Sequence, residues 1–215
     1  MTRVVAILAA VLTLAACSSG SEAEDEIVAA QSGPTQTLYI VGTGTSVGSE
    51  LPDSLRQAWP RVLFDAAFPP ATILVNGATG PSTVARALTE QLPLARELSP
   101  EIVAVWLGSY DLNQGTDATD FGRDLRTLLD ALRAAGAERV LVADLPRLPA
   151  YDEALRLAYN DAIAEAAQGS GSVLVELADL DIEAVDDEAD YQPDVAGHRA
   201  VATAFADALV ASGLP

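Results

Sequence analysis

The chain has 215 residues, and half of them are hydrophobic, so it can bury one sizeable core. Its formal net charge is -19, from 31 acidic and 12 basic residues. Such a surface repels nucleic acid and anionic lipid headgroups, which excludes nucleic-acid binding as a function.

The first residues are typical of an exported protein. Arg3 precedes an apolar run at residues 4–16 that is too short to span a bilayer comfortably and ends in small residues, as secretory signals do. The sequence Leu-Ala-Ala-Cys at residues 14–17 resembles a bacterial lipobox, in which the cysteine is acylated and becomes the mature N-terminus. A cleaved signal followed by an incidental cysteine is the alternative. We predict a signal peptide over residues 1–16, lipidation of Cys17 and an extracytoplasmic, membrane-anchored protein.

Residues 17–36 are rich in Ser, Gly, Glu, Ala and Gln, a composition with too little apolar surface to fold alone. We interpret them as a flexible acidic tether. Cys17 is the only cysteine, so no disulfide can form within the chain. Residues 37–215 remain for one domain, which we expect to be monomeric.

Apolar, β-branched runs alternate with helical patterns through this domain. Helical spacings of three and four place one group of apolar side chains on a single face, and a second group recurs every four residues. The first group is Phe121, Leu125, Leu128, Leu129 and Leu132; the second is Val201, Phe205 and Leu209. We expect Ser82 to cap the second helix and Gly136 to end the third. The predicted strands cover residues 37–41, 71–76, 102–107, 139–143 and 172–177.

This alternation predicts an α/β fold with three layers, α/β/α, around a five-stranded parallel sheet of the flavodoxin-like kind. Tyr39 and Trp106 lie in predicted strands and are assigned to the core. In such sheets, ligands bind at the carboxyl ends of the strands, where the loops after the first three strands converge.

Short blocks follow these strand ends. Gly-Thr-Gly-Thr-Ser-Val-Gly occupies residues 42–48, Asn-Gly-Ala-Thr-Gly residues 76–80 and Gly-Ser-Tyr-Asp-Leu residues 108–112. Trp-Pro occurs at residues 59–60, and Gln-Pro-Asp-Val-Ala-Gly-His at residues 192–198. In this order the five blocks resemble those of the SGNH, or GDSL-type, esterases and lipases. The resemblance covers almost the whole domain and implies the fold of that family.

The resemblance also implies that the chemistry of the family has been removed. Gly44, Tyr110, Ala189 and Gln192 stand where the family has its serine, asparagine, aspartate and histidine. Glycine has no nucleophile, an amide cannot take a proton near neutral pH, and alanine cannot orient a base. The tyrosine is expected to fill the space of an acyl group. Only the backbone N–H of Gly80, the implied oxyanion donor, remains.

A second register leaves one alternative open. Counting back from Trp59 by the family's usual interval lands on Ser46, which would then be the nucleophile of an active esterase. A base is still missing, because His198 is the only histidine and aligns with a non-catalytic position. We expect His198 to cap or pack near the start of the last helix, and Asp111 to brace its loop.

Two further segments bear on metal and ligand binding. The acidic stretch at residues 179–190 lacks the spacing of an EF-hand, so we interpret it as a solvated loop and expect no metal and no cofactor. The proline-rich segment at residues 146–151 resembles a loop at the rim of the family's site, where Arg147 could meet an anionic group of a ligand.

The preferred hypothesis is a catalytically inactive, membrane-anchored member of this fold that binds a ligand or partner in the former active-site cleft. The expected ligand is a small molecule, lipid or glycan. The residues expected to contact it are Gly44, Ser46, Gly80, Tyr110, Arg147 and Gln192. The alternatives are the esterase that uses Ser46 and a structural envelope protein with a closed cleft.

Overall fold

The computed structural model describes residues 36–147, 152–180, 182 and 192–213. The predictions for the signal peptide, Cys17, the tether and Ala189 lie outside the described residues, as does most of the acidic stretch. None of the helices within these ranges is long and apolar enough to cross a membrane.

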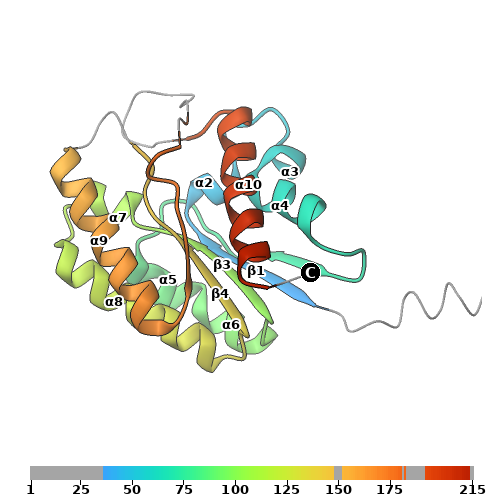
Figure 1. Ribbon diagram of the computed structural model, residues 1–215, viewed down its shortest axis with the longest axis horizontal. Coiled ribbons are helices and arrows are strands. Elements are labelled where there is room, and N and C mark those ends of the chain that lie inside the picture. The colour runs from blue at the N-terminus through green and yellow to red at the C-terminus, as the bar shows by residue number, and fades with distance from the viewer. Residues whose placement is uncertain (1–35, 148–151, 181, 183–191, 214–215) are drawn as a thin grey trace, which may run out of the picture. The chain divides into compact units, whose positions relative to one another are not determined.

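Five parallel strands form one sheet in the order β2-β1-β3-β4-β5, which confirms the predicted architecture (Figure 1). The strands are β1 (Thr37–Gly42), β2 (Ile73–Asn76), β3 (Ile102–Trp106), β4 (Arg139–Ala143) and β5 (Val173–Val175). Three are shorter than predicted: β3 ends one residue early, at Trp106, and β2 and β5 are also shortened. Thr72 donates its N–H to a turn at Pro69, so β2 begins after it. The N–H of Leu177 binds the Asp144 side chain, so β5 ends before it.

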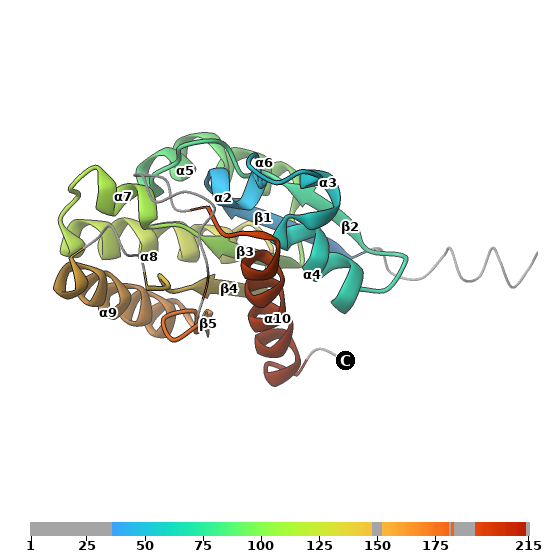
Figure 2. The same cartoon turned by 90° about the horizontal axis from the view of Figure 1, so that it is seen from above.

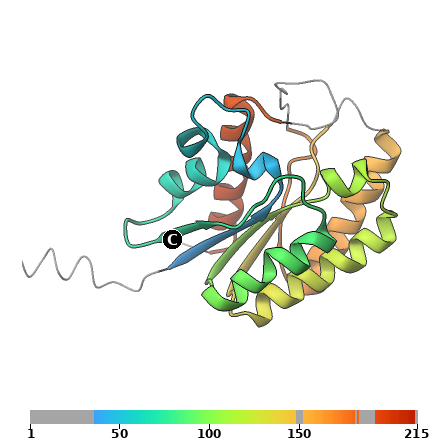
Figure 3. The ribbon, with the colours of Figure 1, turned by 180° about the vertical axis from the view of Figure 1, so that it is seen from behind.

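The helices cover both faces of the sheet (Figure 2). Their bounds are α2 (Gly44–Val47), α3 (Ser54–Gln57), α4 (Trp59–Ala67), α5 (Val84–Glu90), α6 (Leu92–Leu98), α7 (Ser109–Asn113), α8 (Ala118–Ala134), α9 (Glu153–Ser170) and α10 (Val195–Ala211). Helices α5, α6, α8 and α9 share one apolar core with the sheet, and Figure 3 shows this layer from behind. Helices α4 and α10 share the other core.

The predicted apolar faces are the buried ones. All five predicted side chains of α8 are buried, and so are those of α10. Asp117 caps α8 by accepting the N–H of Thr119 at 2.8 Å, and Gly136 follows the helix with a φ of 115°. In the opposite layer the Trp59 and Phe205 rings stack with centroids 4.5 Å apart, which joins α4 to α10.

Tyr39 and Trp106 lie in the core as predicted, but the cap of α5 is one residue later than expected. Thr83, not Ser82, accepts the N–H of Arg86 at the start of α5. Ser82 is buried instead, and its hydroxyl accepts a hydrogen bond from Gln91. The prediction for Ser82 was wrong because a contact distant in sequence uses its side chain.

Candidate active-site cleft

The blocks singled out in the sequence gather at one end of the sheet. Helix α2 follows β1, the loop at residues 77–83 follows β2, and α7 follows β3. The register pairs Ile40 with Asn76 and Gly42 with Trp106, so these strands end at a common edge. The beginning of α10 lies at the same end (Figure 1). The predicted site residues of these segments therefore share the edge where α/β proteins bind ligands.

The structure brings Gly44 and Gln192 together although they are far apart in sequence. A Cβ atom built on Gly44 would lie 3.5 Å from Nε2 of Gln192, the one contact within 4 Å among the described residues beyond its chain neighbours and its own helix. The Gln192 side chain is buried, and its Oε1 has no hydrogen-bond partner among the described residues. At the two positions where the block alignment predicts a nucleophile and a base, the chain therefore has a glycine and an amide side chain.

Ser46 lies in the core rather than in the cleft. It is fully buried, and its hydroxyl accepts a hydrogen bond from the indole Nε1 of Trp59 at 3.2 Å. Its backbone carbonyl accepts from the side-chain amide of Asn76 at 2.9 Å. A Cβ built on Gly42 would lie 2.2 Å from the Ser46 hydroxyl oxygen, so the glycine makes room for this side chain. This placement does not fit the expected roles of Ser46 as a ligand contact or as a nucleophile.

His198 is also part of the core. Its Nδ1 accepts the N–H of Trp59 at 3.1 Å, so it caps the start of α4 from a position 139 residues away. The cap of its own helix is Asp194, which accepts the N–H of Gly197 at 2.7 Å. Burial lowers the pKa of the imidazole from 6.5 to about 4, so His198 is neutral near pH 7. His198 packs near the start of α10, as expected, but the helix that its side chain caps is α4.

Asp111 holds its loop in place through a hydrogen bond to α5, as predicted. Both of its carboxylate oxygens lie 3.1 Å from the N–H of Val84 and so hold the start of α5. Burial raises its pKa from 3.8 to about 6, against the opposing effect of that hydrogen bond. The Val84 bond therefore fixes the loop between β2 and α5 relative to α7.

The remaining predicted residues are less buried than Ser46 and Gln192. Tyr110 is half-buried, while Gly80 and Arg147 are exposed. Tyr110 is close enough to Arg86 to interact with it electrostatically, although the Arg86 pKa is raised mainly by its hydrogen bond to Glu90. Arg86 also donates to the carbonyl of Pro81 at 3.1 Å, in the loop after β2. That Tyr110 fills the space of an acyl group stays a prediction.

Sequence reasoning missed Gln91, which fixes the first block. Its Oε1 accepts the N–H of Gly42 at 3.0 Å, and its Nε2 donates to the Gly42 carbonyl at 2.8 Å and to the Ser82 hydroxyl at 3.0 Å. The hydroxyl of Tyr39 donates to the Gln91 carbonyl at 2.8 Å. The sequence gives one indication of this role, which is a polar glutamine directly before Leu92, between two short apolar helices. We name this group of contacts the Gln91 clamp.

Sequence reasoning also missed Asp144, at the end of β4. Its carboxylate accepts the N–H of Leu177 at 2.5 Å, and burial raises its pKa to about 6. Nearby, Arg156 donates to the carbonyl of Leu145 at 2.9 Å and pairs with Glu153. These contacts hold the beginning of the loop that carries Arg147.

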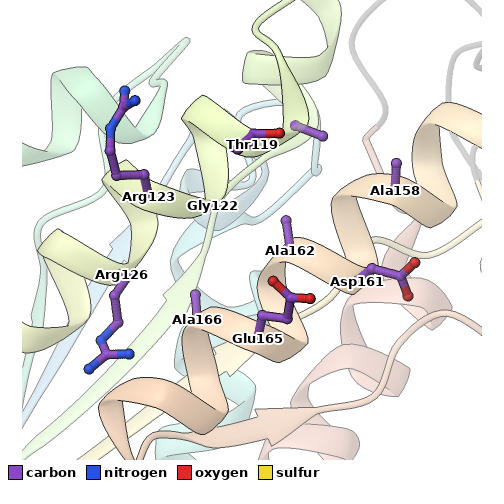
Figure 4. Close-up of a pocket in the computed structure, with 10 residues that line it drawn as sticks. Thr119, Gly122, Arg123, Arg126, Ala158, Asp161, Ala162, Glu165 and Ala166 are labelled. Atoms are coloured by element: carbon purple, nitrogen blue, oxygen red, sulfur yellow. The ribbon is translucent and has the colours of Figure 1, made fainter.

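A separate hollow of about 470 Å³ lies between α8 and α9 (Figure 4). Its floor consists of small residues, and a Cβ on Gly122 would lie 3.0 Å from that of Ala162, which explains the close approach of the helices. Arg123 and Arg126 line one rim, and the other carries Asp161 and Glu165. None of the predicted site residues lies here, so the edge of the sheet at the strand ends, where they gather, remains the candidate site.

The fold and the positions of the blocks define a hydrolase-type α/β protein of the SGNH class. Residues 39–200 match the model of the GDSL-like Lipase/Acylhydrolase family, and the chain belongs to this family. It is 32% identical over 128 residues to thioesterase 1/protease 1/lysophospholipase L1 of Escherichia coli K12, which covers 57% of this chain and 59% of that protein. The chain thus matches less than two thirds of this relative's length.

Solved structures agree on the fold. TesA superposes with a TM-score of 0.69 at 23% identity, covering 81% of this chain and 98% of that one. The esterase EstA from Pseudoalteromonas sp. also gives 0.69, at 18% identity, with 82% and 98% covered. At these identities the likeness establishes the architecture alone.

Proposed function

We propose that this family member is a membrane-anchored lipoprotein that binds a ligand in the former active-site cleft without hydrolysing it. The proposal rests on one observation, which is that the side chain of Gln192 lies next to Gly44. Acyl transfer needs a nucleophile and a base that takes its proton. Glycine supplies no nucleophile, and the glutamine amide does not accept a proton near neutral pH.

Among the described residues, Ser46 and His198 offer no simple replacement for these two groups. Ser46 is fully buried and hydrogen-bonded to Trp59. His198, the only histidine of the chain, has its Nδ1 engaged by the backbone and its Nε2 buried. Neither side chain can reach an ester in the cleft without a rearrangement of the core. Both therefore support loss of catalysis rather than a shifted catalytic centre.

An active esterase is the second candidate. The E. coli relative is named as a thioesterase and lysophospholipase, so hydrolysis of acyl esters is the function that kinship alone favours. On this alternative Ser46 would be the nucleophile after local opening of α2. The two candidates differ in one measurable property, which is turnover.

The purified full chain is expected to release no nitrophenol from short-chain nitrophenyl esters above the buffer rate. Removing triad members typically costs several orders of magnitude in rate, and here the nucleophile and base positions are both substituted. The Ser46→Ala variant, with its fold verified by circular dichroism, should give the same background. Turnover by the native chain that disappears in Ser46→Ala would establish the esterase and overturn the proposal.

The anchor has its own test. Cys17→Ser is expected to move the protein from the membrane fraction to the soluble fraction, or to leave it unprocessed, because acyl chains on Cys17 would provide the anchor. Ser18→Ala, next to it, is the control and should remain in the membrane fraction. Membrane retention of a processed Cys17→Ser protein would contradict the lipoprotein assignment.

A further inference from the structure

The hollow between α8 and α9 has a floor of small side chains on the side of these helices that faces away from the sheet (Figure 4). The floor consists of Ala118, Thr119, Gly122, Ala158, Ala162 and Ala166. Leu155, which is 38% exposed, lies three residues before Ala158 and so continues this face of α9. Small side chains let further helices approach closely, so two such faces can meet as the two halves of a four-helix bundle.

The charges around the hollow differ from those of the rest of the chain. Helices α8 and α9 together carry four arginines and six carboxylates, a net charge of -2 in a chain of -19. Long-range repulsion between two copies is therefore small at this face. The signs are also sorted, because Arg123 and Arg126 line the α8 rim while Asp161 and Glu165 line the α9 rim. The hollow thus has one basic and one acidic edge.

The two helices run in the same direction and in register. A Cβ built on Gly122 would lie 3.0 Å from the Cβ of Ala162, and one built further along, on Gly169, would meet the guanidinium of Arg126. Residues that come later in α8 therefore lie beside residues that come later in α9. Each arginine of the basic edge consequently has a carboxylate of the acidic edge at nearly the same height along the helices.

This arrangement is complementary to a second copy of itself. A two-fold axis parallel to the helices and above the hollow keeps every residue at its height and places α8 of one copy opposite α9 of the other. Arg123 then faces Asp161 of the second copy with an offset of about 3 Å along the helix, and Arg126 faces Glu165 with about 2 Å. A two-fold axis perpendicular to the helices would instead place like charges opposite each other.

The arginines are available for such contacts. Arg123 pairs with Asp120 at 2.6 Å and Arg126 pairs with Asp130 at 2.7 Å, and these arginine side chains are 64% and 42% exposed. Exposed ion pairs within one helix contribute little to stability. Both side chains can therefore turn toward a second copy at small cost.

We infer that the chain self-associates through this face, as a dimer in which α8 and α9 of two copies form a four-helix bundle. The inference does not rest on the proposed function, and it replaces the monomer expected from the sequence. Each helix is about 26 Å long and about 10 Å wide, so the interface buries about 1,000 Å² in total, near the lower limit for specific association. The dimer is therefore weak and forms at micromolar concentrations.

Sedimentation velocity of the full chain carrying Cys17→Ser tests this inference, because the variant lacks the acyl chains that would hold copies together in micelles. A dimer is expected to appear as the concentration rises from about 1 to about 500 µM. Arg123→Glu with Arg126→Glu makes both edges acidic, and Asp161→Arg with Glu165→Arg makes both edges basic. Each pair of changes should weaken dimerisation at least about 10-fold, although the second pair reduces the net negative charge of the chain.

A mixture of the two variants gives the sharpest result. Every facing pair is again of opposite charge, so a heterodimer should form at least as tightly as the native dimer. Arg56→Glu with Arg61→Glu, an equal change of charge on α3 and α4, is the control and should affect dimerisation far less. A native chain that stays monomeric throughout this range, or folded variants that do not associate when mixed, would overturn the inference.

Discussion

Gly42→Ala is expected to destabilise the protein by about 1–3 kcal/mol or more, as overpacking of a core does. The new Cβ would lie 2.2 Å from the hydroxyl oxygen and 2.8 Å from the Cβ of Ser46, and 3.4 Å from the carbonyl of Trp106. Ser46 has no room to withdraw, because it is fully buried and hydrogen-bonded to Trp59. Urea unfolding should show a lower midpoint with an unchanged m-value.

Gly44→Ala is the matched control, two residues further along the chain. Among the described residues its Cβ would make an ordinary contact, at 3.5 Å to Gln192, so the change in stability should stay within about 0.5 kcal/mol. Equal stabilities for Gly42→Ala and the native chain would contradict the packing described for Ser46. They would also reopen the question of whether its hydroxyl can reach the cleft.

The second large effect concerns pH. Asp111 and Asp144 have pKa values raised by burial from 3.8 to about 6, so folding favours their neutral forms. Their stabilising effect is fully present below pH 4 and is lost as the pH rises through about 6. Each shift corresponds to about 2–3 kcal/mol. Asp111→Asn should therefore gain stability relative to the native chain as the pH rises from 4 to 7.

The contribution of His198 to stability depends on pH in the opposite direction. Its pKa falls from 6.5 to about 4 on folding, so its contribution is present above pH 6.5 and is lost as the pH falls toward 4. His198→Asn keeps an acceptor near the Nδ1 position for the N–H of Trp59 but does not titrate. Relative to the native chain, this variant should gain stability as the pH is lowered from 7 to 4.

Urea unfolding of the native chain and both variants, at steps between pH 4 and 7.5, measures these effects as differences. The two difference curves should slope in opposite directions through the same window. A flat curve for Asp111→Asn would show that this carboxyl titrates normally, and a flat curve for His198→Asn would show the same of the imidazole. Each result would contradict the corresponding burial argument.

The fold could be predicted because its signals are local. Runs of apolar residues marked the strands, and the spacing of Leu125, Leu128 and Leu132 marked the buried face of α8. The order of the blocks also predicted that residues 44 and 192 lie close together, and the structure has them side by side. Such features need no knowledge of individual side-chain contacts.

The detailed contacts of the site could not be predicted, because they join residues that are distant in sequence. Ser46 is buried by Trp59 and by the missing side chain of Gly42, which no periodicity reveals. Gln91 binds Gly42 across 49 residues, and His198 binds Trp59 across 139. Each side chain could equally have been solvent-facing on the evidence of its neighbours in the chain.

The Gln91 clamp has a consequence for how the family's chemistry can be lost. At the end of β1, the Gln91 side chain binds the N–H and the carbonyl of Gly42. The indole of Trp59 donates a hydrogen bond to the hydroxyl of Ser46. None of them uses a side chain at residue 44. Selection for a stable fold therefore places little constraint on that position, and a serine there can drift to glycine without loss of folding. The residues that secure the fold are therefore adjacent to, but separate from, the position that the block alignment assigns to the nucleophile.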